Sequence, residues 1–301
     1  MKKNEKEMGK MKKQIKNILW ATDFSSESLT ALNYAGFLAD KFGASIMALH
    51  VVPDFAPALY ETRGVLVAEL MEKQEESQIK AGKKLEKIQS QTGIKFSRML
   101  VETGSPGKKI AEIAEKEKCQ LIAIGRKGLS ALEKILLGSV ASRVLRHSRV
   151  PVLVTPRMRK TPEIKNILVP TDFSGKEEKE RDYAWMMASA LQADLTLIYV
   201  LELYDFKFSP EEIKKMMDQA LERLKKRKKR QQEFQVKEVV VRDLNAAAGI
   251  VAYAAKNKMD LILMSTCVSP IERFFLGSTT EKVISYATVP VLALPSVYCE
   301  K

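Results

Sequence analysis

The sequence is poor in the residues that build metal centres and disulfide frameworks. It has three cysteines and two histidines among 301 residues. Cys119, Cys267 and Cys299 are far apart and form no Cys-x-x-Cys pair, and neither His50 nor His147 adjoins one of them. Structural zinc sites need closely spaced ligands, and disulfide-stabilised domains need many cysteines. We therefore expect neither a protein-bound metal nor a disulfide framework.

Long apolar runs are also absent. No stretch approaches the roughly 20 apolar residues of a membrane-spanning helix, and the lysine-rich start lacks the apolar region of a secretory signal. We therefore expect a cytoplasmic protein without a membrane partner. The 301 residues, 46% of them hydrophobic, allow two domains that each bury a core of their own.

Positive charge is concentrated in two segments. The formal net charge is +13, but residues 1–16 contain seven lysines against two glutamates, and residues 225–230 are all lysine or arginine. The remainder is nearly balanced. We interpret residues 1–16 as a basic arm, and the run at 225–230 as the solvated end of a helix. The charge therefore gives little support to nucleic-acid binding.

An internal repeat organises the chain. Residues 17–25 read NILWATDFS and residues 166–174 read NILVPTDFS, while RVPVLV at 149–154 returns as TVPVLA at 288–293. Two prolines and three cations lie between the copies, in the apolar-poor stretch from Pro156 to Pro162. The repeat predicts domain 1 at 17–156, a linker at 157–162 and domain 2 at 163–301.

Short apolar runs alternate with longer segments of helical periodicity in the first copy. The expected strands are 18–21, 45–52, 95–101, 121–125 and 150–154. This alternation indicates βαβ units, and right-handed crossovers place helices on both faces of a parallel sheet. The sequence thus predicts an α/β fold with two tandem open parallel sheets.

Serines mark where several helices are expected to begin. The candidates are Ser25, Ser105 before Pro106, Ser174 with Glu177, and Ser209 with Glu212. A serine can cap the free amides of a first turn, a glutamate three residues later completes a capping box, and proline suits the first helical position. The helix starting at Ser209 is expected to continue to Arg230.

Glycines follow the fourth expected strand at informative spacing. The chain reads Gly125-Arg-Lys-Gly128, then nine residues, then Gly138-Ser139 at the start of a helix. Glycines let backbone amides approach phosphate oxygens, and a helix N-terminus favours an anion. Because ligands of open parallel sheets bind at the carboxyl ends of the strands, Asp23 after the first strand belongs to the same edge.

The spacing Gly-x2-Gly-x9-Gly-Ser, with Thr-Asp after the first strand and His-Val after the second, resembles the ATP-binding type of the universal stress protein family. The resemblance covers nearly the whole chain as two tandem domains. It implies an adenine nucleotide alpha hydrolase-like fold, with five strands per domain in the order 3-2-1-4-5. It also implies that the fifth strands of the two domains pair within the chain.

The resemblance further implies a set of nucleotide-binding residues in domain 1. The adenine and ribose end would be formed by Ala21, Thr22, Asp23 and Val51, and the ribose and phosphate end by Gly125, Arg126, Lys127, Gly128, Gly138, Ser139 and Val140. ATP is the implied ligand, ADP and AMP stay open, and Mg²⁺ would be held only through the phosphates. We assign no catalytic residue, and we interpret His50 and His147 as structural.

The second copy departs from this pattern. Its corresponding stretch is Ser265-Thr-Cys-Val268, eight residues, then Gly277-Ser278. Two of the three glycines are replaced and one spacer residue is missing, although Asp172 is retained. Because Ser265 and Val268 carry Cβ atoms where close backbone approach is required, we expect domain 2 to be mainly structural.

Three functions fit the sequence. We favour an ATP-binding regulatory or stress-response protein whose nucleotide orders the loop from Leu129 to Leu137. One alternative is a slow ATPase, although no GxxxxGK[ST] loop and no obvious base accompany the glycines. The other is a basic adaptor for nucleic acid or an acidic partner, whose binding would fall steeply with salt. Association of two chains into a homodimer is left open.

Overall fold

The computed structural model describes residues 15–54, 65–128, 137–158, 161–173, 178–203, 208–227, 236–266 and 276–295. The chain divides into two compact units, and the boundary in the linker falls between residues 160 and 161. We call the unit that precedes this boundary domain 1 and the unit that follows it domain 2.

Domain 1 contributes five parallel strands. They are β1 (Asn17–Ala21), β2 (Ser45–Val52), β3 (Phe96–Thr103), β4 (Leu121–Gly125) and β5 (Val152–Thr155). Their order is β3-β2-β1-β4-β5. The order in which the chain adds strands therefore reverses at the neighbouring strands β1 and β4. Asp23 follows β1, and the glycine loop follows β4.

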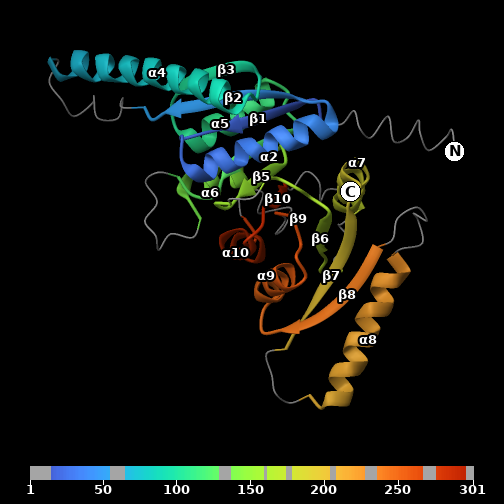
Figure 1. Cartoon of the computed structure of the whole chain (residues 1–301). Coiled ribbons are helices and arrows are strands. Elements are labelled where there is room, and N and C mark those ends of the chain that lie inside the picture. The colour runs from blue at the N-terminus through green and yellow to red at the C-terminus, as the bar shows by residue number, and fades with distance from the viewer. Residues whose placement is uncertain are drawn as a thin grey trace. The chain divides into compact units, whose positions relative to one another are not determined.

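Within the described residues, four helices connect these strands (Figure 1). They are α2 (Ser26–Phe42), α4 (Val65–Thr92), α5 (Pro106–Lys116) and α6 (Ser139–His147). Helix α2 packs on β1, β4 and β5, and α4 packs on β2 and β3, whereas α5 and α6 pack against each other. Because parallel crossovers are right-handed, α2 and α4 cover one face and α5 and α6 the other.

The core of domain 1 lies between the strands and these helices. Its fully buried side chains include Trp20 and Leu19 of β1, Leu49 of β2, Ile122 of β4 and Leu32 of α2. Strands buried on both faces read as continuous apolar runs, which is why β1 and β4 were visible in the sequence.

Domain 2 repeats the architecture. Its strands are β6 (Asn166–Pro170), β7 (Asp194–Glu202), β8 (Val236–Asp243), β9 (Leu261–Ser265) and β10 (Val291–Leu294). Its helices are α7 (Glu178–Leu191), α8 (Pro210–Arg227), α9 (Ala246–Lys256) and α10 (Ser278–Tyr286). The strands are parallel in the order β8-β7-β6-β9-β10.

The predicted α/β class and the strand order are confirmed in both domains. Three strands have bounds that differ from expectation. β1 begins one residue earlier, at Asn17, and β3 runs from Phe96 through polar residues to Thr103 beside β2. β5 runs from Val152 to Thr155, because Pro151 has no amide to donate to the ladder. The expected pairing of the fifth strands stays a prediction.

Three helices begin directly after the predicted serines, and in two of them the serine side chain caps the helix. Ser25 caps α2 by accepting from the Ser28 amide, and Ser209 and Glu212 form a complete capping box. Ser105 makes no capping hydrogen bond within the described residues, although Pro106 occupies the first position of α5 as predicted. Residues 174–177 and 228–230 lie outside the described part.

Candidate functional site

The chain leaves β1 through a turn held by Thr22. The Thr22 amide donates to the carbonyl oxygen of Leu49 at 2.9 Å, and its hydroxyl is hydrogen-bonded to the Ser28 hydroxyl at 2.8 Å. The same hydroxyl accepts from the amide of Phe24, whose φ of 68° lies in the left-handed region. A side chain in that region is strained, so these bonds hold the turn in an unfavourable conformation.

Asp23 makes contacts in two directions. The sequence left open whether it caps the following helix or contacts a nucleotide. In the structure Ser25 caps α2, and Asp23 Oδ1 accepts from the Ser25 amide at 3.0 Å. Asp23 Oδ2 lies against Gly128 so closely that a Cβ at this glycine would collide with it. The carboxylate therefore lies beside the backbone of the glycine loop.

Gly125 ends β4 against the first turn of α2. A Cβ at this position would come within 2.7 Å of the Ser28 amide nitrogen and 2.9 Å of the Glu27 Cβ. Distances this short are forbidden to side chains against backbone. Gly125 is thus required for the strand to approach the helix, a reason distinct from ligand contact.

Arg126 and Lys127 are joined to the body of domain 1 through their backbone. The Arg126 amide donates to Thr155 at 2.8 Å, and the Lys127 amide donates to Glu27 Oε2 at 2.5 Å. Glu27 is only 8% exposed. Burial lowers the pKa of Arg126 below its ordinary value, although the Glu27 carboxylate acts in the opposite direction. The guanidinium stays cationic at neutral pH.

Helix α6 begins directly beside this loop. The Gly138 amide donates to the Arg126 carbonyl oxygen at 2.9 Å, and Gly138 is the N-cap residue. Among the described residues no side chain caps this end, and its first turn contains no acidic residue. Ser139 and Val140 are exposed there. The first-turn amides, at the positive end of the helix dipole, thus have no side-chain acceptor among the described residues.

The end of β2 completes the arrangement with Val51, which the resemblance implied for the adenine end, and with His50, which the sequence analysis interpreted as structural. Val51 is buried, and the preceding His50 is hydrogen-bonded through Nδ1 to the Thr22 carbonyl oxygen at 2.8 Å. The His50 ring stacks on Phe24 with centroids 4.5 Å apart, and Lys84 Nζ lies 5.0 Å from the Phe24 centroid. Burial lowers the pKa of His50.

The structure thus brings most of the predicted residues to one edge of domain 1. Asp23 meets Gly128, the Arg126 carbonyl meets Gly138, and His50, next to Val51, meets Thr22. Glu27 was missed, because an acidic residue in a first helical turn is explained by the helix dipole alone. The role of the predicted residues in nucleotide binding stays a prediction.

Comparison with known proteins decides the family. The model of the Universal stress protein family matches residues 14–156 and again residues 163–295. The chain belongs to the universal stress protein family. This universal stress protein contains two family domains in tandem, and the matched ranges leave only a short segment between them.

Several relatives share this assignment. Universal stress protein MJ0531 of Methanocaldococcus jannaschii is 40% identical over 148 residues, which are 48% of this chain and 84% of the relative. Universal stress protein MJ0577 of the same organism is 32% identical over 155 residues, 47% of this chain and 95% of the relative. A crystal structure of a universal stress protein from Archaeoglobus fulgidus covers 93% of this chain and 98% of its own, with 24% identity and a TM-score of 0.66, and shows the shared fold.

Domain 2 of this universal stress protein keeps the turn but not the glycine loop. Phe173 has a φ of 60°, and its amide donates to the Thr171 hydroxyl at 3.3 Å, as at Phe24 and Thr22. The turn therefore belongs to the fold rather than to a ligand. Gly277 is the N-cap of α10, but Glu281 stands in the first turn. Of the stretch 265–268, residues 267 and 268 lie outside the described part.

The strand end of domain 2 is closely packed. A cavity of about 10 Å³ lies beside Val169, Pro170 and Thr171 at the end of β6, with Leu197 of β7 in its wall. This volume holds about one water molecule. This small cavity is therefore not itself a site for a base.

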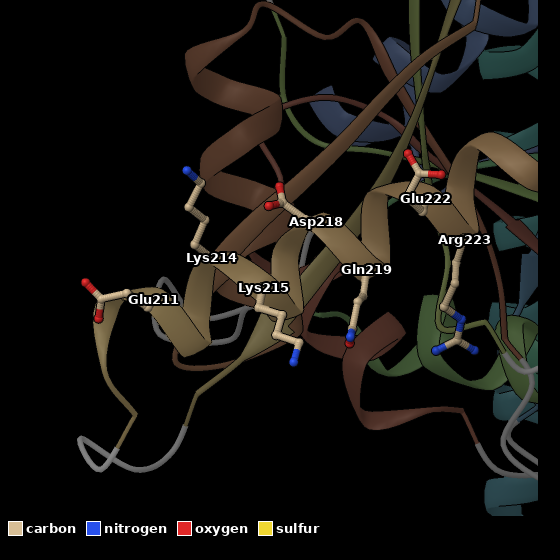
Figure 2. Close-up of a pocket in the computed structure, with 7 residues that line it drawn as sticks. All are labelled: Glu211, Lys214, Lys215, Asp218, Gln219, Glu222 and Arg223. Carbon is tan, nitrogen blue, oxygen red and sulfur yellow. The ribbon is translucent and has the colours of Figure 1, made fainter.

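A hollow of about 680 Å³ on α8 is unlike a nucleotide site. Figure 2 shows the residues that line it, all from this one helix: Glu211, Lys214, Lys215, Asp218, Gln219, Glu222 and Arg223. Both charge signs alternate along it, whereas ligand clefts bring a few polar groups together over an apolar floor. Within the described residues, no group of three potential metal ligands and no helix able to span a membrane are found.

Proposed function

We propose that this universal stress protein binds one adenine nucleotide per chain, with ATP as the ligand, in domain 1. The observation that carries the proposal is the approach of Gly128 to Asp23, where a Cβ would collide with the carboxylate. The glycine at the end of the Gly125–Gly128 loop lets the backbone approach Asp23, and the loop adjoins the N-terminus of α6, which no side chain among the described residues caps and whose first-turn amides favour an anion. Domain 2 retains the scaffold and carries a glutamate in the corresponding first turn.

The two ends of the site would take different parts of the nucleotide. Asp23 lies at the end of β1 and would accept a hydrogen bond from a ribose hydroxyl, with Ala21, Thr22 and Val51 toward the base. The phosphates would lie at Gly138 and Ser139 of α6, where the dipole and the amides favour negative charge. Mg²⁺ would be bound through the phosphates.

We infer a regulatory role rather than a catalytic one. Arg126 and Lys127 can balance phosphate charge, but a protonated guanidinium or ammonium cannot act as a general base. Binding itself is therefore the event that the site supports. Of the loop expected to respond, residues 129–137, only Leu137 lies within the described residues. The proposal includes the cytoplasmic location expected from the sequence.

Two measurements test the proposal. Mass spectrometry of the purified protein should detect an adenine nucleotide, and calorimetric titration should show saturable binding of ATP but not of GTP. Ser139→Ala should weaken ATP binding by about tenfold, as expected for a lost hydrogen bond to a charged group, whereas the matched Ser278→Ala in domain 2 should not. Absence of binding by every adenine nucleotide, or equal affinity for GTP, would contradict the proposal.

A further inference from the structure

Glu27 and Ser28, in the first turn of α2, link the segments on which the predicted site depends. The Trp20 indole donates to the Ser28 carbonyl oxygen at 2.7 Å, and the Thr22 hydroxyl is bonded to the Ser28 hydroxyl. The Thr155 hydroxyl donates to the Glu27 carbonyl oxygen at 3.2 Å. One helical turn thus contacts the ends of β1 and β5.

The Glu27 side chain extends these contacts to the glycine loop. Its carboxylate accepts from the Lys127 amide at 2.5 Å and lies near the Arg126 guanidinium. The Arg126 carbonyl oxygen accepts from the Gly138 amide, so the loop in turn contacts the start of α6. A continuous chain of contacts therefore leads from Glu27 to the glycine loop and to the start of α6, the two segments that would hold the phosphates.

Domain 2 lacks the residues that build this arrangement. Alignment of the repeat places Val169, Lys176, Glu177, Ser265 and Leu294 where domain 1 has Trp20, Glu27, Ser28, Gly125 and Thr155. A lysine at the position of Glu27 cannot accept a hydrogen bond from a backbone amide. The carboxylate is thus present in the domain with the glycine loop and replaced in the domain without it.

We propose that Glu27 is a positioning residue that holds the Gly125–Gly128 loop and the N-terminus of α6 in the geometry that receives phosphates. This inference rests on the proposed function. Glu27 is buried, and its carboxylate accepts a hydrogen bond from the Lys127 amide. It sets affinity for the phosphate chain and leaves recognition of adenosine to the end of β1.

Three substitutions separate the reach of the side chain from its charge. Glu27→Gln keeps an oxygen at the same reach and should bind ATP within about threefold of the original protein, since it can still accept from the amide. Glu27→Asp keeps the charge but is one carbon shorter, and Glu27→Ala has no acceptor. Both should lose about tenfold or more in ATP affinity while adenosine affinity changes by less than about threefold. Glu112→Ala, an exposed glutamate of α5, is the control.

Hydrogen exchange at the Lys127 amide provides a readout that needs no nucleotide. Exchange should be slow in the original protein and Glu27→Gln, and faster in Glu27→Asp and Glu27→Ala. Unchanged ATP affinity in Glu27→Ala, or an equal loss for adenosine and ATP, overturns the proposal. If the original protein binds no nucleotide, the proposed function fails and the affinity part of this inference fails with it; the exchange rates alone then decide whether Glu27 holds the loop.

Discussion

The carboxyl ends of the strands have a similar backbone conformation in domains 1 and 2, but the residues that surround it differ. Both have a phenylalanine of positive φ after the first strand, at Phe24 and Phe173. Both stack a second ring and a cation on it: His50 with Lys84 in domain 1, Tyr199 with Arg223 in domain 2. In domain 1 Asp23 lies against Gly128, where the sequence of domain 2 has Val268.

This difference separates what the fold needs from what a ligand needs. A feature kept in both copies, such as the strained turn, is explained by the fold, because a threonine hydroxyl accepts from the phenylalanine amide in each domain. A feature of domain 1 alone, such as the approach of Gly128 to Asp23, cannot be explained in this way, because the sequence of the second copy has Val268 in place of this glycine. Substitutions that exchange features between the copies therefore test function with a control inside the same chain.

The largest effect is expected for Gly128→Val, which introduces the residue that domain 2 has at this position. Its Cβ would collide with the Asp23 Oδ2 atom and displace the carboxylate that would bind the ribose. We expect ATP affinity, measured by calorimetry, to fall about 100-fold, since a displacement of about 1 Å in a preorganised site has effects of that order. Gly82→Ala is the matched control because a Cβ there meets nothing within 4 Å. Retention of full affinity in Gly128→Val would contradict the assigned loop.

Gly125→Ala should act on stability before it acts on binding. Its Cβ would press on the backbone of α2, and overpacking of this kind costs about 1–3 kcal/mol. Ser265→Ala, at the corresponding position of domain 2, should change stability by less than about 0.5 kcal/mol. Denaturant unfolding can resolve the domains, because Trp20 and Trp185 are the only tryptophans and lie one in each. Equal losses in both domains would refute the distinction.

Asp23→Ala and Asp172→Ala compare the two aspartates of the repeat. Removal of the Asp23 carboxylate should weaken ATP binding about tenfold, as expected for one hydrogen bond to a charged group. Asp172→Ala should leave the affinity unchanged. Competition between ATP and a fluorescent nucleotide measures both. If the two substitutions weaken binding equally, the nucleotide site is not confined to domain 1.

The smallest effect concerns pH. Burial lowers the pKa of His50 below its ordinary value of 6.5, so the unfolded chain takes up the proton first as the pH falls. The stability of domain 1, followed through Trp20, should therefore decline as the pH falls below about 6.5. The decline should be smaller in His50→Gln. An identical pH profile in both proteins would show that another group is responsible.

The fold could be predicted from the sequence because its signals are local and repeated. Buried parallel strands such as β1 and β4 are continuous apolar runs, and the capping box of Ser209 and Glu212 lies within one turn of chain. The repeat then predicted the same strand order and helix placement for the second copy. Errors were confined to strand ends, where Pro151 and polar residues of an edge strand shift the boundary.

The candidate site could be predicted only in part. The glycines could be recognised because they lie close together in the sequence. The contacts of Glu27 with Lys127 and of His50 with Thr22 link positions 100 and 28 residues apart, and no local pattern marks them. Nor could the sequence show that Gly125 is required by the approach of α2 rather than by a ligand.

The most direct test of the account is the stoichiometry of ATP binding to the full chain. Calorimetric titration should give one site per chain, and this site should be lost in Gly128→Val and kept in Asp172→Ala. Two equivalent sites per chain, or one site that survives Gly128→Val, would contradict the assignment of nucleotide binding to domain 1.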